Sequence, residues 1–73
     1  MSPQSLAQSV KSVEISWLQN AIAAKRTEAS EWYGIAAQAS TTDSRAFATD
    51  NGDMVFEAAV RLGQRLARLE VQA

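Results

Sequence analysis

Apolar residues recur at helical spacing along both halves of this chain, and a polar stretch separates the halves. In the first half they lie three, four or seven positions apart on one side of a helix: Leu18, Ile22, Ala29, Trp32 and Ala36. In the second half they step by four, three, four and three: Val55, Ala59, Leu62, Leu66 and Leu69. Both patterns predict amphipathic α-helices, and the second is a short heptad seam.

The pattern predicts an all-α fold, a two-helix antiparallel hairpin, as one domain over residues 1–73. We expect helices at about residues 3–40 and 53–71, joined by a connection at about 41–52. That connection is rich in Thr, Asp, Asn and Gly, which favour caps and turns. An extra helical turn over residues 44–48 is an open alternative. A turn at Gly34 is the alternative, because Gly weakens a helix by about 1 kcal/mol relative to Ala.

Each helix has more apolar surface than one neighbour can cover. A second stripe in the first helix comprises Val10, Val13, Trp17, Ala21 and Ala24, and one in the second comprises Phe56, Val60, Gly63 and Ala67. A chain of 73 residues without cysteine has a small core and no disulfides to support it. We therefore expect two hairpins to dimerise into a four-helix bundle. The expected core and dimer seam residues are Leu18, Ile22, Trp32, Phe56, Ala59, Leu62, Leu66 and Leu69.

Composition narrows the function classes. The chain has neither Cys nor His, so a thiol nucleophile, an imidazole base and a transition-metal site are not expected, and we predict no enzyme and no cofactor. The net charge of -1 makes a nucleic acid an unfavourable partner. The longest apolar run is too short to span a membrane. The first residues lack the pattern of a signal peptide, so we expect a cytoplasmic protein.

Six residues that flank the seams are the predicted partner-binding set: Lys25, Arg26, Tyr33, Arg61, Arg65 and Arg68. Charged residues at the rim of an apolar patch set orientation and association rate, and an exposed aromatic contributes affinity. The three arginines of the second helix also suit a solvated face, because Arg favours helix and complements the dipole near a helix C-terminus. Both interpretations stay open here.

Residues 31–43 read Glu-Trp-Tyr-Gly-Ile-Ala-Ala-Gln-Ala-Ser-Thr-Thr-Asp. With Ala58-Ala59 and Leu62-Gly63, they resemble the small anti-quorum-sensing proteins of Pseudomonas phages, over about residues 25–70. The resemblance implies a homodimer of helical hairpins that inhibits a LuxR-type activator and also binds a type IV pilus assembly ATPase. It predicts a phage-encoded inhibitor acting in the host cytosol during host takeover. The chain departs from that family in its shorter connection and in Met54, where the family has Trp.

Residues 32–39 also resemble the Trp-x-Gly segment of the WXG secreted hairpins. That resemblance implies a turn at Gly34 and a secreted or structural hairpin, and it requires helix through residues 41–43 and 50–53. A small DNA-binding regulator is the third possibility, disfavoured by the net charge. The leading expectation is a small protein that binds a host regulatory protein.

Overall fold

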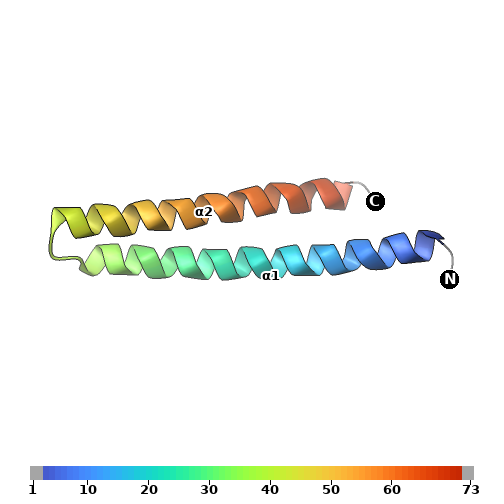
Figure 1. Ribbon diagram of the computed structural model, residues 1–73, viewed down its shortest axis with the longest axis horizontal. Coiled ribbons are helices and arrows are strands. Elements are labelled where there is room, and N and C mark those ends of the chain that lie inside the picture. The colour runs from blue at the N-terminus through green and yellow to red at the C-terminus, as the bar shows by residue number, and fades with distance from the viewer. Residues whose placement is uncertain (1–2, 72–73) are drawn as a thin grey trace.

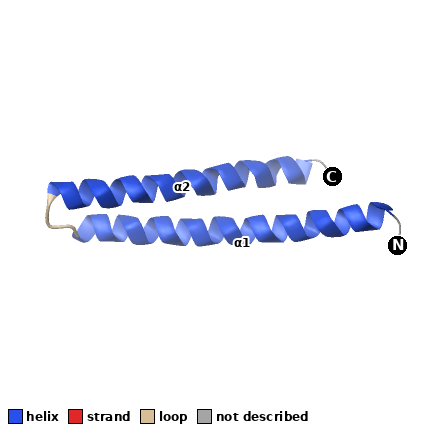
Figure 2. Cartoon of the chain, in the orientation of Figure 1, coloured by secondary structure: helices blue, strands red, loops and turns tan. Residues whose placement is uncertain are grey.

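The chain folds into two long helices that lie side by side and run in opposite directions (Figure 1). The computed structural model describes residues 3–71. Helix α1 spans Pro3–Gln38 and helix α2 spans Thr42–Val71, and no strand occurs in this described range (Figure 2). The rod measures 60 × 16 × 11 Å, and the first turns of α1 extend past the end of α2. The all-α hairpin predicted from the sequence is confirmed.

The connection between the helices is short, and its predicted position at about 41–52 is wrong. It comprises residues 39–41, and α2 begins at Thr42 rather than near Asp53. Thr41 caps α2, because the backbone N–H of Ser44 donates to Thr41 Oγ1 at 3.0 Å. Arg45 donates to the carbonyl of Ala39 at 3.4 Å, which gives a partner to a carbonyl near the end of α1.

Residues 42–53 are helical although many of them are poor helix formers. Ala48 and Gly52 are buried four positions apart, and the seam of α2 continues from them without interruption. The side-chain amide of Asn51 donates to the carbonyl of Phe47 at 2.8 Å, so this residue bonds within the helix instead of breaking it. Packing against α1 therefore outweighs the low helix propensity of this stretch.

The interior of the hairpin is one heptad-spaced seam with few large side chains. Buried or partly buried positions step by four and three, through 18, 22, 25, 29, 32 and 36 on α1 and through 48, 52, 55, 59, 62, 66 and 69 on α2. The buried apolar residues are Leu18, Ile22, Ala29, Ala36, Ala48 and Ala59. Leu18 is the largest of them and is fully buried. The alanines let the helix backbones approach closely but bury little apolar surface.

Phe56, which we expected in the core or the dimer seam, is not part of the core of the single hairpin. Its side chain is 48% exposed, because it follows the seam residue Val55 and points about 100° away from it around the helix. Gly34 lies within α1, so the chain does not turn there. Its backbone also has no positive φ.

Candidate interaction faces

The structure divides the predicted partner-binding residues between two sides of the hairpin. Lys25 and the three arginines of α2 line one groove, together with Trp17. Arg26 lines a second groove, which contains Phe56. Lys25 borders the first groove from the seam, and Arg26 follows it about 100° around α1, so the two grooves open on different sides of the hairpin. We call these surfaces the Trp17 face and the Phe56 face.

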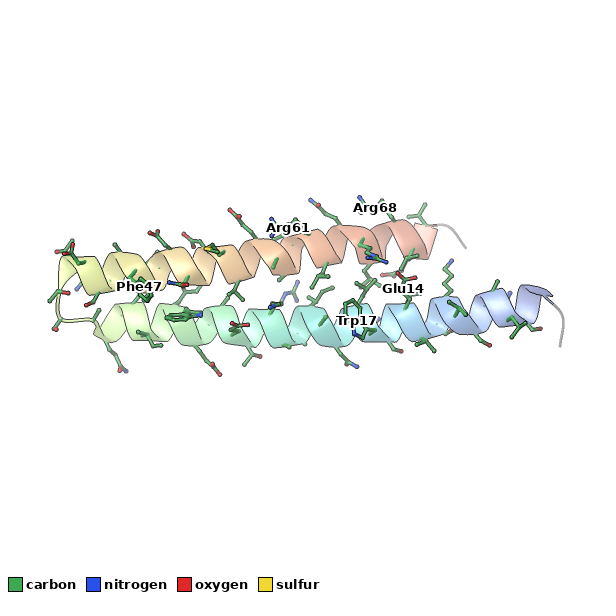
Figure 3. The ribbon with its side chains drawn as sticks, in the orientation of Figure 1. Glu14, Trp17, Phe47, Arg61 and Arg68 are labelled. Atoms are coloured by element: carbon green, nitrogen blue, oxygen red, sulfur yellow. The ribbon has the colours of Figure 1, made fainter. Side chains whose placement is uncertain are left out.

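The groove of the Trp17 face has a volume of about 510 Å³ and lies between α1 and α2. Its lining residues are Trp17, Ala21, Lys25, Ala58, Arg61, Leu62, Arg65 and Arg68. Trp17 is 60% exposed, and Figure 3 shows it on α1 at a level between Arg61 and Arg68 of α2. This face therefore combines a large exposed aromatic side chain with four cationic ones.

Only part of this positive charge is paired within the hairpin. Arg65 forms an ion pair with Glu14, which joins α2 to α1 across the groove. An exposed pair of this kind contributes about 0.2–1 kcal/mol, so it fixes position more than it adds stability. In the described part of the chain, Arg61 and Arg68 form no ion pair.

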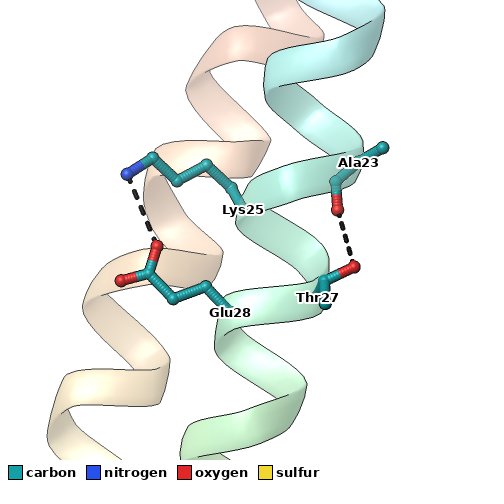
Figure 4. A network of polar contacts seen from close by, with 4 residues as sticks. All are labelled: Ala23, Lys25, Thr27 and Glu28. Atoms are coloured by element: carbon teal, nitrogen blue, oxygen red, sulfur yellow. Dashed lines mark hydrogen bonds and ion pairs between the residues drawn. The ribbon is translucent and has the colours of Figure 1, made fainter.

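Lys25 occupies a seam position and is only partly buried. Its ammonium group lies 3.7 Å from a carboxylate oxygen of Glu28, one turn further along α1 (Figure 4). The neighbouring Thr27 hydroxyl donates to the carbonyl of Ala23 at 3.1 Å. The aliphatic stem of Lys25 therefore packs along the groove while the charge stays near solvent.

The Trp17 face continues toward both ends of the rod with exposed apolar side chains. Near the start of α1, an open groove of about 510 Å³ is lined by Ser9, Val10, Val13, Glu14 and Trp17. Near the turn, Ile35, Phe47 and Met54 are exposed. Phe47 packs edge-on against Trp32, with ring centroids 6.0 Å apart and an interplanar angle of 79°.

The Phe56 face has a smaller groove of about 310 Å³. Its lining residues are Arg26, Phe56, Ala59, Val60, Gly63, Gln64 and Ala67. Phe56 and Val60 are exposed large side chains, and Gly63 and Ala67 follow them at helical spacing. A Cβ built on Gly63 would meet nothing within 4 Å, so the surface is hollow there.

Tyr33 borders the Phe56 face near the turn and has a partner within the chain. Its hydroxyl donates to Asp53 Oδ1 at 2.6 Å, and its ring lies against Gly52. The hydrogen bond to Asp53, partial desolvation and the negative charges of Asp53 and Glu57 raise the pKa of Tyr33 above its ordinary value. Sequence reasoning did not find this contact, although the glycine at a seam position was a usable signal.

The predicted site residues thus form two separate surfaces rather than one. No known protein family, curated protein or solved structure matches the chain. Within the described residues, no stretch of α1 or α2 has both the length and the hydropathy needed to cross a membrane. The chemistry of the Trp17 face and the Phe56 face therefore decides what the hairpin can bind.

Proposed function

We propose that this chain is a non-enzymatic interaction protein that pairs with a second copy and binds another protein. The observation that supports this most directly is the imbalance between its thin interior and its exposed apolar faces. One large side chain, Leu18, is fully buried among the described residues, whereas Trp17, Phe47, Met54 and Phe56 are exposed. Side chains of this size normally contribute the hydrophobic core of a bundle.

The dimensions of the hairpin support self-association. Its accessible surface is 5484 Å² for a mass of 7.9 kDa. A compact monomer of this mass exposes about 4,400 Å². The hairpin therefore exposes more surface than its size requires. Pairing into a four-helix bundle reduces this excess and covers one apolar face of each hairpin.

The Phe56 face is suited to binding a helix of another protein. Residues 56, 60, 63 and 67 are spaced by four, three and four, so they follow one line along α2. Two large side chains followed by two small positions make a ridge and a groove, the features that pack against a neighbouring helix. The pattern fits recognition of an amphipathic helix in a groove.

The nature of the partner follows from the resemblance of residues 31–43 to the anti-quorum-sensing phage proteins. It makes a LuxR-type transcriptional activator the first partner to test and a pilus assembly ATPase the second. The WXG alternative requires helix through residues 41–43 and 50–53, which α2 provides from Thr42 onward, but it also requires a turn at Gly34, and α1 continues past it to Gln38. A regulator that binds DNA is less favoured, because the net charge is -1. Inhibition of a regulatory protein is therefore the proposed role.

A pull-down with the tagged chain and a purified LuxR-type activator tests this proposal. We expect Phe56→Ser to lower retention at least tenfold, because exposed aromatics dominate interface energetics. Leu6→Ser is the matched control, since Leu6 is 53% exposed and lies on α1 away from this groove. Circular dichroism should show both variants helical. Equal retention of the parent and Phe56→Ser would exclude this face, and salt-sensitive binding of duplex DNA by the parent would favour a DNA regulator.

A further inference from the structure

The Trp17 face has a regular arrangement along both helices. On α1, residues 10, 17, 24, 31 and 38 recur every seven positions, and on α2 residues 47, 54, 61 and 68 do the same. Residues seven apart lie on one line along a helix, so each helix presents one continuous stripe on this face. The stripe of α1 contains Val10, Trp17, Ala24, Glu31 and Gln38, and the stripe of α2 contains Phe47, Met54, Arg61 and Arg68.

Charge is separated along α2 beside its stripe. Asp50 and Glu57 lie on the line next to residues 54 and 61, in the half nearer the turn. Arg61 and Arg68 lie in the other half and form no ion pair in the described part of the chain. Over the whole hairpin, residues 21–57 have a net charge of -3, and the rest of the chain has +2. One end of the rod is therefore acidic and the other basic.

This separation is complementary to itself when two rods lie antiparallel. If α2 crosses α2 of a second copy with residue 59 at the centre, Asp50 lies at the level of Arg68 of the partner subunit. Glu57 then lies at the level of Arg61 of the partner subunit. Because the arrangement has two-fold symmetry, each of these pairs occurs twice. A parallel arrangement would instead place arginines beside arginines, which is unfavourable.

The first helix fits the same arrangement. The contacts of Glu14 with Arg65 and of Tyr33 with Asp53 fix how α1 lies beside α2, so residue 59 is level with residues 20–27 of α1. Ala24 lies on the stripe at this level, and small side chains at a centre allow close approach. Val10 of one copy then lies level with Gln38 of the partner subunit, and Trp17 lies level with Glu31 of the partner subunit. The two rods overlap along nearly their whole length.

We propose that the Trp17 face is occupied by a second copy of this chain, in an antiparallel four-helix bundle centred near Ala24 and Ala59. This inference rests on the proposed self-association and specifies its face, direction and register. The Phe56 face stays free in this bundle, so one dimer presents two copies of the partner-binding surface. Arg61, Arg65 and Arg68 then belong to the dimer contact rather than to the partner site.

Charge exchange at Asp50 and Arg68 tests the arrangement, with dimer dissociation measured by sedimentation equilibrium. We expect Asp50→Arg and Arg68→Asp each to weaken the dimer about tenfold, because each variant places like charges at two symmetric contacts. The double variant restores opposite charges and should return to within about threefold of the parent. Asp43→Arg is the charge-matched control, since it has no counterpart in the described part of α2 in this register.

Cysteine cross-linking gives an independent test, because the chain contains no cysteine. Disulfides require Cα atoms about 4.4–6.8 Å apart, so oxidation reports close approach. In the antiparallel bundle, Ala24→Cys should cross-link to itself near the two-fold axis. Val10→Cys should cross-link to Gln38→Cys of a mixed partner but not to itself. Self-linking of Val10→Cys would overturn the antiparallel direction.

The outcomes separate this arrangement from self-association itself. A parent chain that stays monomeric at high micromolar concentration would overturn both. A stable dimer whose dissociation constant is unchanged by Asp50→Arg and by Arg68→Asp would overturn only the proposed face and direction. If Arg68→Asp abolished binding of a partner protein while the dimer persisted, the groove would belong to an acidic partner. If duplex DNA dissociated the dimer, the groove would instead be a binding site for a phosphate backbone.

Discussion

At Gly52, the packing of α1 against α2 depends on one side chain, the ring of Tyr33. A Cβ there would lie 2.7 Å from Cε1 of Tyr33, so the ring occupies the space that a larger residue would fill. The glycine weakens α2 locally, since Gly costs about 1 kcal/mol relative to Ala in a helix. The packing of the Tyr33 ring against α2 and its hydrogen bond to Asp53 offset this loss.

We predict that alanine has different effects on stability at Gly34 and Gly52, the two helical glycines nearest the turn. Gly34→Ala should stabilise the fold by about 1 kcal/mol, because a Cβ there meets nothing within 4 Å. Gly52→Ala should lose that gain, because the new methyl group displaces the Tyr33 ring and breaks its hydrogen bond. Thermal melts of the two variants beside the parent measure the difference. An equal rise in Tm would show that the ring moves aside without cost.

The titration of Tyr33 gives a second residue-scale prediction. Its pKa is raised mainly by the hydrogen bond to Asp53, so the folded chain holds the phenol proton more tightly than the unfolded chain. The resulting stability is present below the ordinary tyrosine pKa of about 10 and is lost as the pH rises through the folded value. Tyr33→Phe should therefore show a smaller alkaline loss of Tm than the parent.

The chain has one tyrosine, so phenolate absorbance reports this residue alone. The parent should titrate above pH 10, and Asp53→Ala should move the midpoint back toward about 10. The acids that face the phenol are Asp53 and Glu57, both on α2. A midpoint that does not respond to Asp53→Ala would assign the shift to another cause.

At the scale of elements, the start of α2 depends on an N-cap that the amino-acid composition of this stretch does not reveal. Thr41 accepts the N–H of Ser44 and donates to its hydroxyl at 2.8 Å, so two polar side chains begin the helix. We predict that Thr41→Ala destabilises the fold by about 0.5–2 kcal/mol, the usual effect of losing an N-cap. Chemical denaturation measures it, and Thr42→Ala is the control. Equal small losses in both variants would mean that the cap does not hold the turn.

The sequence predicted the two helices and their seams, because heptad spacing is visible without tertiary information. It predicted the connection wrongly, because Thr, Asp, Asn and Gly were judged by local propensity. Ala48 and Gly52 continue the seam into this stretch, and burial against α1 decides its conformation. The separation of Lys25 and Arg26 between two grooves was also visible, because adjacent residues of a helix point about 100° apart. Gly52 at a seam position signalled a close approach, but Tyr33 as its partner was not predictable, since that contact depends on how the two helices align.

At the scale of the whole molecule, stability and assembly are linked by the thin interior. Leu62 and Leu66 lie in the seam yet are only partly buried in the single hairpin. Leu62 also lines the groove of the Trp17 face, so pairing through that face would bury it further. The folded hairpin and the dimer are then coupled, because the surface that pairing covers adds to a small core.

Coupling of this kind makes Tm depend on protein concentration. For a chain that unfolds from a dimer to separate monomers, each tenfold rise in concentration adds about 1.4 kcal/mol to the free energy of unfolding of the dimer. We predict a Tm that rises steadily across a hundredfold range of protein concentration, and a lower Tm at each concentration in high salt, which screens the charges of Asp50 and Arg68. Melts followed by circular dichroism measure both effects, and Asp50→Arg should lower the Tm at each concentration. A Tm that is constant over this range would mean that the hairpin is stable alone and that its apolar faces serve other proteins.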